Sequence, residues 1–240
     1  MTNSKTLKAA ALGAAVAAAL TSGVAAAEVT GNAAVTNNYM WRGTSLSNDQ
    51  AAVQGGIDWG NETGFYVGTW LSNTDFSGDF GFGFENGTGY EMDIYAGFAN
   101  SVGDFDYDLG VVTYQFPITP EINVTEIYGA GTFKVLTLGV FYTVDAGSAN
   151  KDGAFDEGDI YVYGSLDFAT KPGDFSFYAG SYMFDNDQQF GNGELDYIHY
   201  GASWGKGDFT FAVDKNDIDA TDKADKVRFT VMWSKDFELM

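Results

Sequence analysis

The feature that most constrains this chain is the pattern of connections between segments that alternate apolar and polar residues. Twelve such segments can be recognised; the connections after the even-numbered ones are a few residues long, and those after the odd-numbered ones are longer and polar. In a closed antiparallel sheet this places every short turn at one rim and every long loop at the other, which is typical of membrane β-barrels and not of Greek-key sandwiches. The expected strands are 29–43, 50–60, 64–73, 89–100, 104–116, 123–134, 135–145, 158–169, 174–184, 195–205, 207–214 and 225–237.

Several of these segments have one apolar and one polar face. In segment 89–100, Met92 and Ile94 lie on one face, and Glu91 and Asp93 on the other. Such a strand fits a barrel with lipid outside and water inside, and equally a soluble exported sandwich with its apolar face turned inward. Because the connection lengths favour the barrel, we predict an all-β fold, a closed up-and-down antiparallel transmembrane β-barrel of about 12 strands, with short periplasmic turns and longer outer loops. The same alternation is found in 104–116, 158–169 and 225–237.

The N-terminal residues show the three parts of a secretory signal peptide in order. Lys5 and Lys8 form a positive region, an apolar run too short to span a bilayer as a helix follows, and Ala25-Ala26-Ala27 supplies small residues for cleavage. We therefore expect residues 1–27 to be removed and residues 28–240 to form one outer-membrane barrel. No later apolar run is long enough for a spanning helix, so membrane insertion would be by strands.

The chain is strongly acidic and contains no cysteine. Its formal net charge is −21, and removal of Lys5 and Lys8 with the signal peptide changes this to −23. Such a charge argues against nucleic acid as a partner and suits the attraction of cations. An exported domain without disulfides needs another source of stability, which a closed hydrogen-bond ladder supplies. No motif in the chain indicates a cofactor or a metal site.

The aromatic residues, 16% of the chain, are placed as contact with lipid requires. All five tryptophans fall near expected strand ends, where membrane barrels carry aromatic girdles. Phe237 lies close to the C-terminus, similar to the terminal aromatic residue by which the barrel-assembly machinery recognises its substrates, although three residues follow it. We therefore expect outer-membrane lipid and this machinery as partners. The predicted girdle residues are Trp41, Trp59, Trp70, Trp204 and Trp233.

The first third of the expected barrel holds a set of closely spaced aromatic, glycine and polar residues. They are Tyr39-Met40-Trp41-Arg42-Gly43, Ser45, Ser47, Gln54-Gly55-Gly56, Asp58, Gly64-Phe65-Tyr66-Val67-Gly68-Thr69-Trp70 and Ser72-Asn73, followed by Glu91, Asp93, Tyr95 and Gly97. In these residues the chain resembles the TorF-type porin family, proteobacterial proteins long grouped as conserved and uncharacterised. The resemblance implies an outer-membrane barrel and a channel. It implies no established substrate and no catalytic residues.

The polar faces of the expected strands carry a set of charged residues that are candidates for lining a pore. We place Arg42 and Arg228 near the outer ends of the first and last strands, opposite an acidic cluster of Glu91 and Asp93, and such charge arrangements set ion selectivity. The alternative is an interior filled by ion pairs and tyrosines, with no open pore. The candidate pore-lining residues are Arg42, Asp58, Glu91, Asp93, Asp106, Asp108, Glu126, Asp167 and Arg228.

These observations lead to three functional hypotheses. We expect a non-enzymatic porin of the outer membrane, a passive diffusion channel for small hydrophilic solutes or ions with a preference for cations. The alternatives are a structural or adhesive barrel with a plugged lumen that works through its outer loops, and an outer-membrane lipase. A lipase needs a paired serine and histidine, but the only histidine, His199, points inward by its phase, with Tyr197 and Ser203. Segments 150–159 and 78–89 match neither a calcium loop nor a phosphate-binding loop in spacing.

Overall fold

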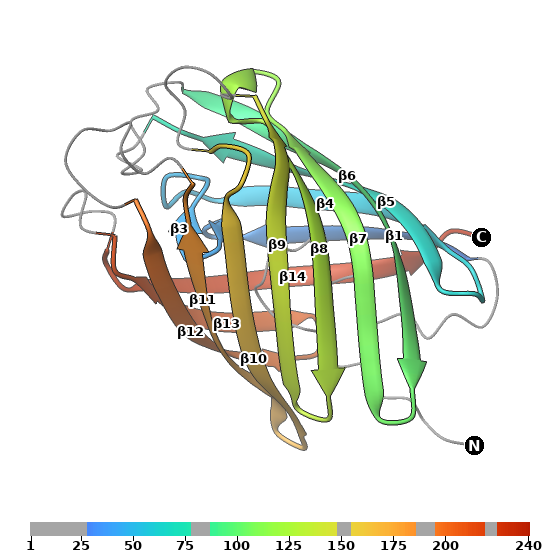
Figure 1. The fold of residues 1–240 in the computed structure, drawn as a ribbon. Coiled ribbons are helices and arrows are strands. Elements are labelled where there is room, and N and C mark those ends of the chain that lie inside the picture. Colours follow the sequence, from blue (N-terminus) through green and yellow to red (C-terminus); the bar gives the residue numbers. More distant parts are fainter. Residues whose placement is uncertain (1–27, 78–86, 148–154, 186–194, 219–224) are drawn as a thin grey trace.

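Twelve antiparallel strands close into a barrel in the computed structural model, which describes residues 28–77, 87–147, 155–185, 195–218 and 225–240. Figure 1 shows the strands as a tilted ring, with the short strand β3 inside it. The predicted fold class is therefore confirmed. Among the described residues, no helix combines the length and apolar character needed to cross a membrane. The barrel strands are β1 (Glu28–Thr36), β4 (Ala52–Gly60), β5 (Phe65–Asp75), β6 (Thr88–Val102), β7 (Phe105–Gln115), β8 (Val124–Phe133), β9 (Leu136–Ala146), β10 (Ile160–Thr170), β11 (Gly173–Met183), β12 (Tyr197–Lys206), β13 (Phe209–Asn216) and β14 (Arg228–Glu238).

The first barrel strand closes the ring. β1 pairs with β14 on one side, from Thr30 opposite Glu238 to Thr36 opposite Met232, and with β4 on the other. The connections alternate as predicted: after β4, β6, β8, β10 and β12 the strands are joined by turns of two to four residues, and the other connections are longer. All short turns therefore lie at one rim, where β1 begins and β14 ends.

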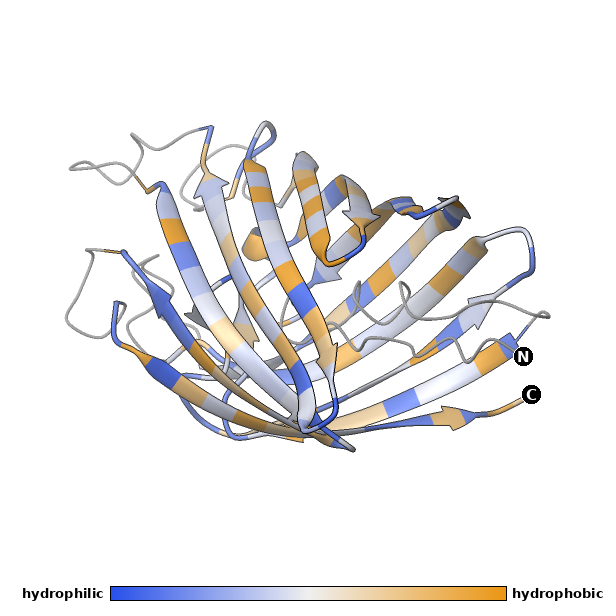
Figure 2. Ribbon diagram, turned by 90° about the horizontal axis from the view of Figure 1, so that it is seen from below, coloured by the Kyte–Doolittle hydropathy of each residue, from blue (hydrophilic) through white to orange (hydrophobic). Residues whose placement is uncertain are grey.

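Side chains along each strand alternate between an apolar outer face and a polar inner face. In β14, Phe229 is 72% exposed, whereas its neighbour Arg228 is 9% exposed. Figure 2 shows the resulting stripes of hydrophobic and hydrophilic residues along the strands. A closed barrel with a wide band of exposed Val, Ile, Leu and Phe fits lipid and not water. The face assignments for segments 89–100, 104–116, 158–169 and 225–237 are confirmed, and the soluble-sandwich alternative is wrong.

The main error of the sequence prediction concerns the first strand, expected over 29–43. β1 ends at Thr36, and the chain then turns into the barrel as a hairpin before returning to the wall at Ala52. We call residues 37–51 the lumen hairpin; it contains the two-residue strands β2 (Met40–Trp41) and β3 (Thr44–Ser45). The remaining element is a short 3₁₀ helix, η1 (Pro120–Ile122), in the connection before β8.

Two of the predicted girdle tryptophans lie inside the barrel. Trp70 is 2% exposed, because the inner face of β5 carries Trp70 while its outer face carries Val67 and Leu71. Trp41 is 8% exposed, because it belongs to the lumen hairpin and not to the wall. The other three, Trp59, Trp204 and Trp233, share the phase of the outward-facing side chains of their strands.

Inward tyrosines lie over glycines of the neighbouring strand. Tyr128 is paired directly with Gly110, and a Cβ added to Gly110 would lie 2.4 Å from the Tyr128 hydroxyl oxygen. Tyr66 lies over Gly97 in the same way. Glycine therefore provides the room that lets large rings lie flat against the wall of a narrow barrel. The same cross-strand pairing joins Gly68 to Tyr95, Gly139 to Tyr163 and Gly201 to Tyr178.

Candidate functional site

The tip of the lumen hairpin is a two-residue turn that lies against the barrel wall. Arg42 and Gly43 both have positive φ angles, 46° and 80°, as a type I′ hairpin turn requires. A Cβ at Gly43 would lie 2.3 Å from the Cβ of His199, so only glycine fits there. The Gly43 carbonyl accepts a hydrogen bond of 2.8 Å from the side-chain amide of Asn216. The turn is thus seated on β12 and β13 at a fixed position.

The lumen hairpin is held in shape by its own hydrogen bonds. The Asn38 side-chain oxygen accepts a bond of 2.6 Å from the Ser45 hydroxyl, and the Ser47 hydroxyl accepts one of 2.9 Å from the Tyr39 amide. All residues from Trp41 to Ser47 are buried. The hairpin is therefore a packed element of the interior and not a loose loop.

A buried ion pair joins the hairpin tip to the opposite wall. The two terminal nitrogens of Arg42 donate to the two carboxylate oxygens of Glu126 on β8, at 2.8 and 2.5 Å. The side chains are 4% and 1% exposed. This fork-to-fork geometry gives the strongest and most directional form of charged hydrogen bond.

Aromatic rings surround the same guanidinium group. Its central carbon lies 4.2 Å from the ring centre of Tyr161, 4.4 Å from that of Trp41 and 4.8 Å from that of Phe141, with Tyr182 at 5.2 Å. Guanidinium groups are attracted to aromatic faces, by up to about 2 kcal/mol at desolvated sites. Arg42 thus contacts the hairpin and the walls at β8, β9, β10 and β11 together.

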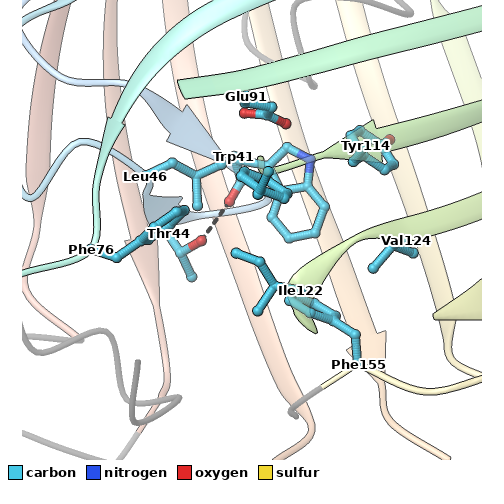
Figure 3. A pocket seen from close by; sticks show the side chains of 10 residues that line it. Trp41, Thr44, Leu46, Phe76, Glu91, Tyr114, Ile122, Val124 and Phe155 are labelled. Atoms are coloured by element: carbon cyan, nitrogen blue, oxygen red, sulfur yellow. Dashed lines mark hydrogen bonds between the residues drawn. The ribbon is translucent and has the colours of Figure 1, made fainter. Parts of the chain in front are cut away.

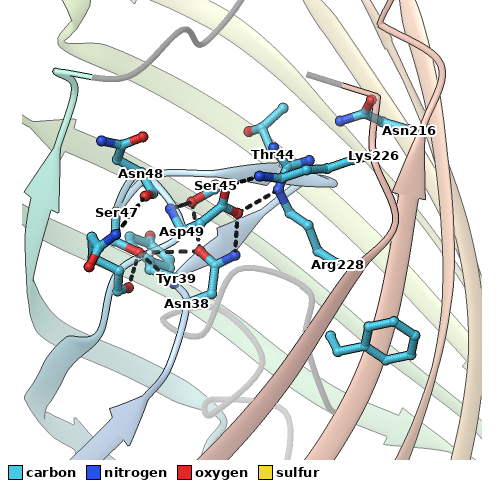
Figure 4. Close-up of polar contacts among 12 residues, drawn as sticks. Asn38, Tyr39, Thr44, Ser45, Ser47, Asn48, Asp49, Asn216, Lys226 and Arg228 are labelled. Carbon is cyan, nitrogen blue, oxygen red and sulfur yellow. Dashed lines mark hydrogen bonds and ion pairs between the residues drawn. The ribbon is translucent and has the colours of Figure 1, made fainter. Parts of the chain in front are cut away.

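A second ionic contact holds the base of the hairpin. The carboxylate of Asp49 accepts a hydrogen bond of 2.8 Å from Arg228 and lies 2.5 Å from the Lys226 ammonium group (Figure 4). Burial opposes the charge on Asp49, but the hydrogen bonds from Lys226 and Arg228 outweigh it and lower the pKa of Asp49. On the other side, the Asp75 amide donates to the Leu46 carbonyl at 2.9 Å. The hairpin is therefore tied to both β14 and β5.

This contact predicts that the attachment of the hairpin depends on pH. A carboxyl group with a lowered pKa stabilises the folded arrangement only while it is ionised. The contribution of Asp49 should be complete above the ordinary aspartate pKa of about 3.9 and should be lost as the pH falls through its lowered value. At pH 7 the urea midpoint of the folded barrel should therefore be lower for Asp49→Asn than for the wild type, and this difference should shrink at pH 3. Asp208→Asn, which removes an exposed ion pair with Lys235, is the control and should keep the wild-type midpoint. Equal midpoints of Asp49→Asn and the wild type at pH 7 would contradict the prediction.

The nine candidate pore-lining residues fall into two groups. The upper group lies toward the long-loop rim, and the lower group lies toward the short-turn rim. In the upper group, Arg42 pairs with Glu126 and Arg228 with Asp49, so the expected basic pair does not form and each arginine has its own carboxylate. Glu91 and Asp93 lie on the inner face of β6 at the same level and are 0% and 1% exposed. The prediction that Arg42 lies near the outer end of the first barrel strand is wrong, because β1 ends at Thr36 and Arg42 belongs to the lumen hairpin.

The lower group consists of carboxylates nearer the short-turn rim. Asp58 accepts a hydrogen bond from the Tyr95 hydroxyl, and Asp108 accepts one of 2.7 Å from the Tyr66 hydroxyl. Asp167 accepts a bond of 2.6 Å from Ser165, and Asp106 is exposed near the rim. With the exception of Asp108, these aspartates retain contact with solvent.

Sequence reasoning missed several residues that hold the hairpin. Asn38, Asp49 and Asn216 carry its hydrogen bonds, but segment 44–49 was expected to be an outer loop. A signal was present in Arg42-Gly43, because a glycine that ends a short alternating run favours a tight hairpin turn. The partners across the barrel had no comparable signal, since Asn216 is 173 residues from Gly43 in the chain.

Nothing in the described part of the barrel supports a hydrolase site. His199 is 2% exposed on the inner face, as predicted, and its Nε2 lies 2.8 Å from the Tyr161 hydroxyl. No serine hydroxyl bonds to this histidine among the described residues. In the same residues, no group of three or more His, Asp or Glu side chains could hold a metal ion. The predicted signal peptide, residues 78–86 of segment 78–89 and residues 150–154 of segment 150–159 lie outside the described residues.

Comparisons with known proteins agree with the fold. A structure from work on the in-meso crystallization of membrane proteins is similar with a TM-score of 0.54, at 8% identity over 87% of this chain and 83% of that one. The Salmonella typhi outer membrane phospholipase matches with a TM-score of 0.46 (12% identity, 93% and 98% covered), and the Pseudomonas aeruginosa outer membrane protein opdK with 0.40 (12% identity, 78% and 58% covered). At these identities the likeness concerns the fold alone. No curated protein matches the sequence significantly.

The sequence itself places the chain in a family. The family model described as a bacterial protein of unknown function, Gcw_chp, matches residues 20–237 and so covers all twelve barrel strands apart from the last residue of β14. The chain therefore belongs to the Gcw_chp family of bacterial proteins of unknown function.

Proposed function

We propose that the protein is an outer-membrane channel of the porin type, and that the lumen hairpin closes it near the long-loop rim. The observation that carries the proposal is the division of the interior into two parts. Toward the short-turn rim the inner face carries polar and acidic residues, of which Asp58, Asp106 and Asp167 are partly or fully exposed. Toward the long-loop rim the lumen is filled by a hairpin that side-chain contacts hold in place. A barrel built only for mechanical stability has no need of partly exposed carboxylates that face its interior. The resemblance to TorF-type porins is in accord with this function.

The charges of the lower lumen favour the passage of cations. Asp58, Asp106, Asp108 and Asp167 face inward, whereas the arginines of the upper lumen are engaged by carboxylates. Carboxylates around a narrow aqueous path raise the local concentration of cations and repel anions. Small hydrophilic cations, or neutral solutes of similar size, are therefore the expected cargo. The apolar outer band favours outer-membrane lipid as the surrounding medium, and strand insertion would need the barrel-assembly machinery.

A second function is favoured by the burial of the hairpin. The seven buried residues from Trp41 to Ser47 and the ion pair of Arg42 with Glu126 would also suit a permanent plug. The protein would then be a structural or adhesive barrel that works through its outer loops. The two functions differ in whether the wild-type barrel ever opens.

The experiment that tests the proposal is conductance of the refolded protein in a planar bilayer under a salt gradient. Folding is first verified by heat-modifiable migration on gels. Discrete opening steps with a cation-selective reversal potential are expected. A folded wild-type barrel that never opens, together with a hairpin-free variant that does, would favour the permanent plug.

Two substitutions test the origin of the selectivity. Asp58→Asn with Asp108→Asn should shift the reversal potential toward that of a non-selective pore, because the changes remove two charges and leave an amide oxygen to accept the hydrogen bonds of Tyr95 and Tyr66. Glu62→Gln, at an exposed position of the short turn after β4, should leave the potential unchanged. Equal reversal potentials for all three proteins would show that these aspartates do not select cations.

A further inference from the structure

The groups that bind the Arg42 guanidinium ion belong mainly to the barrel wall. Glu126 of β8 accepts its two hydrogen bonds, at 2.8 and 2.5 Å. The rings of Phe141, Tyr161 and Tyr182, on β9, β10 and β11, have their centres 4.2 to 5.2 Å from its central carbon. Four consecutive strands thus provide one carboxylate and three aromatic rings. We call these four residues the wall site.

The three rings of the wall site are held by contacts that do not involve the lumen hairpin. Each is stacked on another ring of the barrel, with ring centres 4.3 to 5.8 Å apart. The Tyr161 hydroxyl also lies 2.8 Å from Nε2 of His199. Groups fixed in this way remain organised for binding when their occupant leaves, which reduces the cost of taking up another one. The stacked pairs are Phe141 with Tyr128, Tyr161 with His199 and Tyr182 with Phe184.

The fourth ring at the guanidinium group, Trp41, belongs to the hairpin. Its indole packs against Tyr114 of β7 and Phe155 of the connection before β10, with ring centres 5.9 and 6.0 Å away (Figure 3). Release of the hairpin would therefore withdraw Arg42 and Trp41 together. The wall site would keep its three rings, while the Glu126 carboxylate would lose its counter-charge, and such a group strongly favours a new cationic partner.

The geometry of the wall site favours guanidinium over ammonium ions. Glu126 receives two parallel N–H groups, which a planar guanidinium fork presents and an ammonium group does not. Guanidinium groups are also less strongly hydrated and stack on aromatic faces. We propose that the wall site is a receptor for soluble alkylguanidinium compounds, that Arg42 is its tethered occupant, and that such a compound releases the hairpin by taking the place of Arg42. This inference rests on the proposed function, because access to the wall site requires a hairpin that can leave it.

The tether makes Arg42 a strong competitor for the wall site. A ligand that binds only the released arrangement has an apparent affinity reduced by the fraction of molecules in that arrangement. The wild type should therefore bind a soluble guanidinium compound weakly. Removal of the Arg42 side chain abolishes the competition and should raise the affinity roughly a hundredfold, because breaking the buried pair shifts the hairpin toward release by a similar factor.

Calorimetric titration of the full refolded barrel in nonionic micelles tests the receptor. The probe is ethylguanidinium, which has the heavy atoms that Arg42→Ala removes, and N-ethylurea is its neutral counterpart of the same shape. Ethylguanidinium should bind Arg42→Ala roughly a hundredfold more tightly than the wild type. n-Butylammonium should bind this variant about tenfold more weakly than ethylguanidinium, and ethylurea should not bind. Equal binding of ethylguanidinium and ethylurea by the folded variant, or equal binding of ethylguanidinium by variant and wild type, would overturn the proposal.

Two matched double variants locate the site. Glu126→Gln added to Arg42→Ala keeps the shape of the side chain and removes its charge, so binding of ethylguanidinium should be lost. Glu62→Gln, at an exposed turn of the other rim, should leave the affinity of Arg42→Ala unchanged. If Arg42→Ala does not fold, Arg42→Lys replaces it: the lysine keeps a counter-charge for Glu126 but lacks the fork, and should still bind ethylguanidinium more tightly than the wild type does. Unchanged affinity after Glu126→Gln would overturn the assignment of the site.

Release of the hairpin by the ligand is measured without ion flow. Because the chain contains no cysteine, Thr44→Cys places a single thiol in the hairpin, at a position that is 4% exposed. Ethylguanidinium should raise the rate at which a water-soluble maleimide labels this thiol in the folded barrel, and ethylurea should not. Ligand-dependent labelling of a barrel that never conducts would refute the channel and support the receptor. A labelling rate that ethylguanidinium leaves unchanged would overturn the displacement of Arg42.

Discussion

Replacing Arg42 with Ala should release the lumen hairpin and increase the open fraction of the proposed channel roughly a hundredfold or more. The substitution leaves Glu126 buried without its partner, and breaking a buried pair from one side costs about 3–5 kcal/mol. Each 1.4 kcal/mol corresponds to about a tenfold change in an equilibrium. Because the cost falls on the closed arrangement, the open arrangement should gain population. Single-channel recordings at fixed voltage measure this open fraction.

Two further variants identify the ion pair as the cause. The double variant Arg42→Met with Glu126→Leu removes both charges and keeps the bulk of the side chains. Its open fraction should therefore be lower than that of Arg42→Ala alone. Lys235→Ala, which breaks an exposed pair with Asp208 outside the hairpin, should open no more than the wild type. An Arg42→Ala barrel with the wild-type open fraction would show that the pair does not hold the hairpin.

Replacing Gly110 with Val should prevent formation of the heat-resistant folded barrel or lower its stability strongly. The added Cβ would lie 2.4 Å from the Tyr128 hydroxyl oxygen and 2.7 Å from the backbone oxygen of Ala96. Overpacking of this kind costs about 1–3 kcal/mol where side chains can adjust, and the backbone atom here cannot move without breaking the ladder. The folded fraction on unheated gels and the urea midpoint measure the effect.

The matched control is a glycine with free space around it. Gly205 faces the lumen on β12, and the nearest atoms to an added Cβ are 3.8 and 3.9 Å away. Gly205→Val should fold as the wild type does, since valine suits a strand. If both variants were equally stable, the tyrosine rings would not require glycine beneath them.

The architecture of the wall could be predicted because it depends on local sequence patterns. Period-two alternation indicated which side chains of β6, β7, β10 and β14 face outward and which face inward. The connection lengths indicated a closed sheet with short turns at one rim and long loops at the other. Phase also indicated that Glu91, Asp93 and Asp108 face inward, which the structure confirms. The same alternation also indicates that Trp70 faces inward and does not belong to the outer girdle, because Val67 and Leu71 occupy the outer face of β5.

The lumen hairpin could not be predicted in the same way. The alternation continues through Tyr39 and Trp41, so the pattern does not distinguish a strand that goes on from one that turns inward. What decides the path is a set of distant contacts, such as Arg42 with Glu126, which are 84 residues apart. Both residues could be listed as inward-facing candidates, but their pairing depends on the width of the closed barrel.

The measurement that tests the account most directly is the conductance of a barrel without its hairpin. Thr36 and Ala52 are directly paired in the sheet, so a two-residue Asn-Gly turn can replace residues 37–51. If the hairpin closes an otherwise open acidic lumen, this variant should show a large, steady, cation-selective conductance that the wild type reaches only in brief openings. A folded hairpin-free barrel that conducts no more than the wild type would contradict the account.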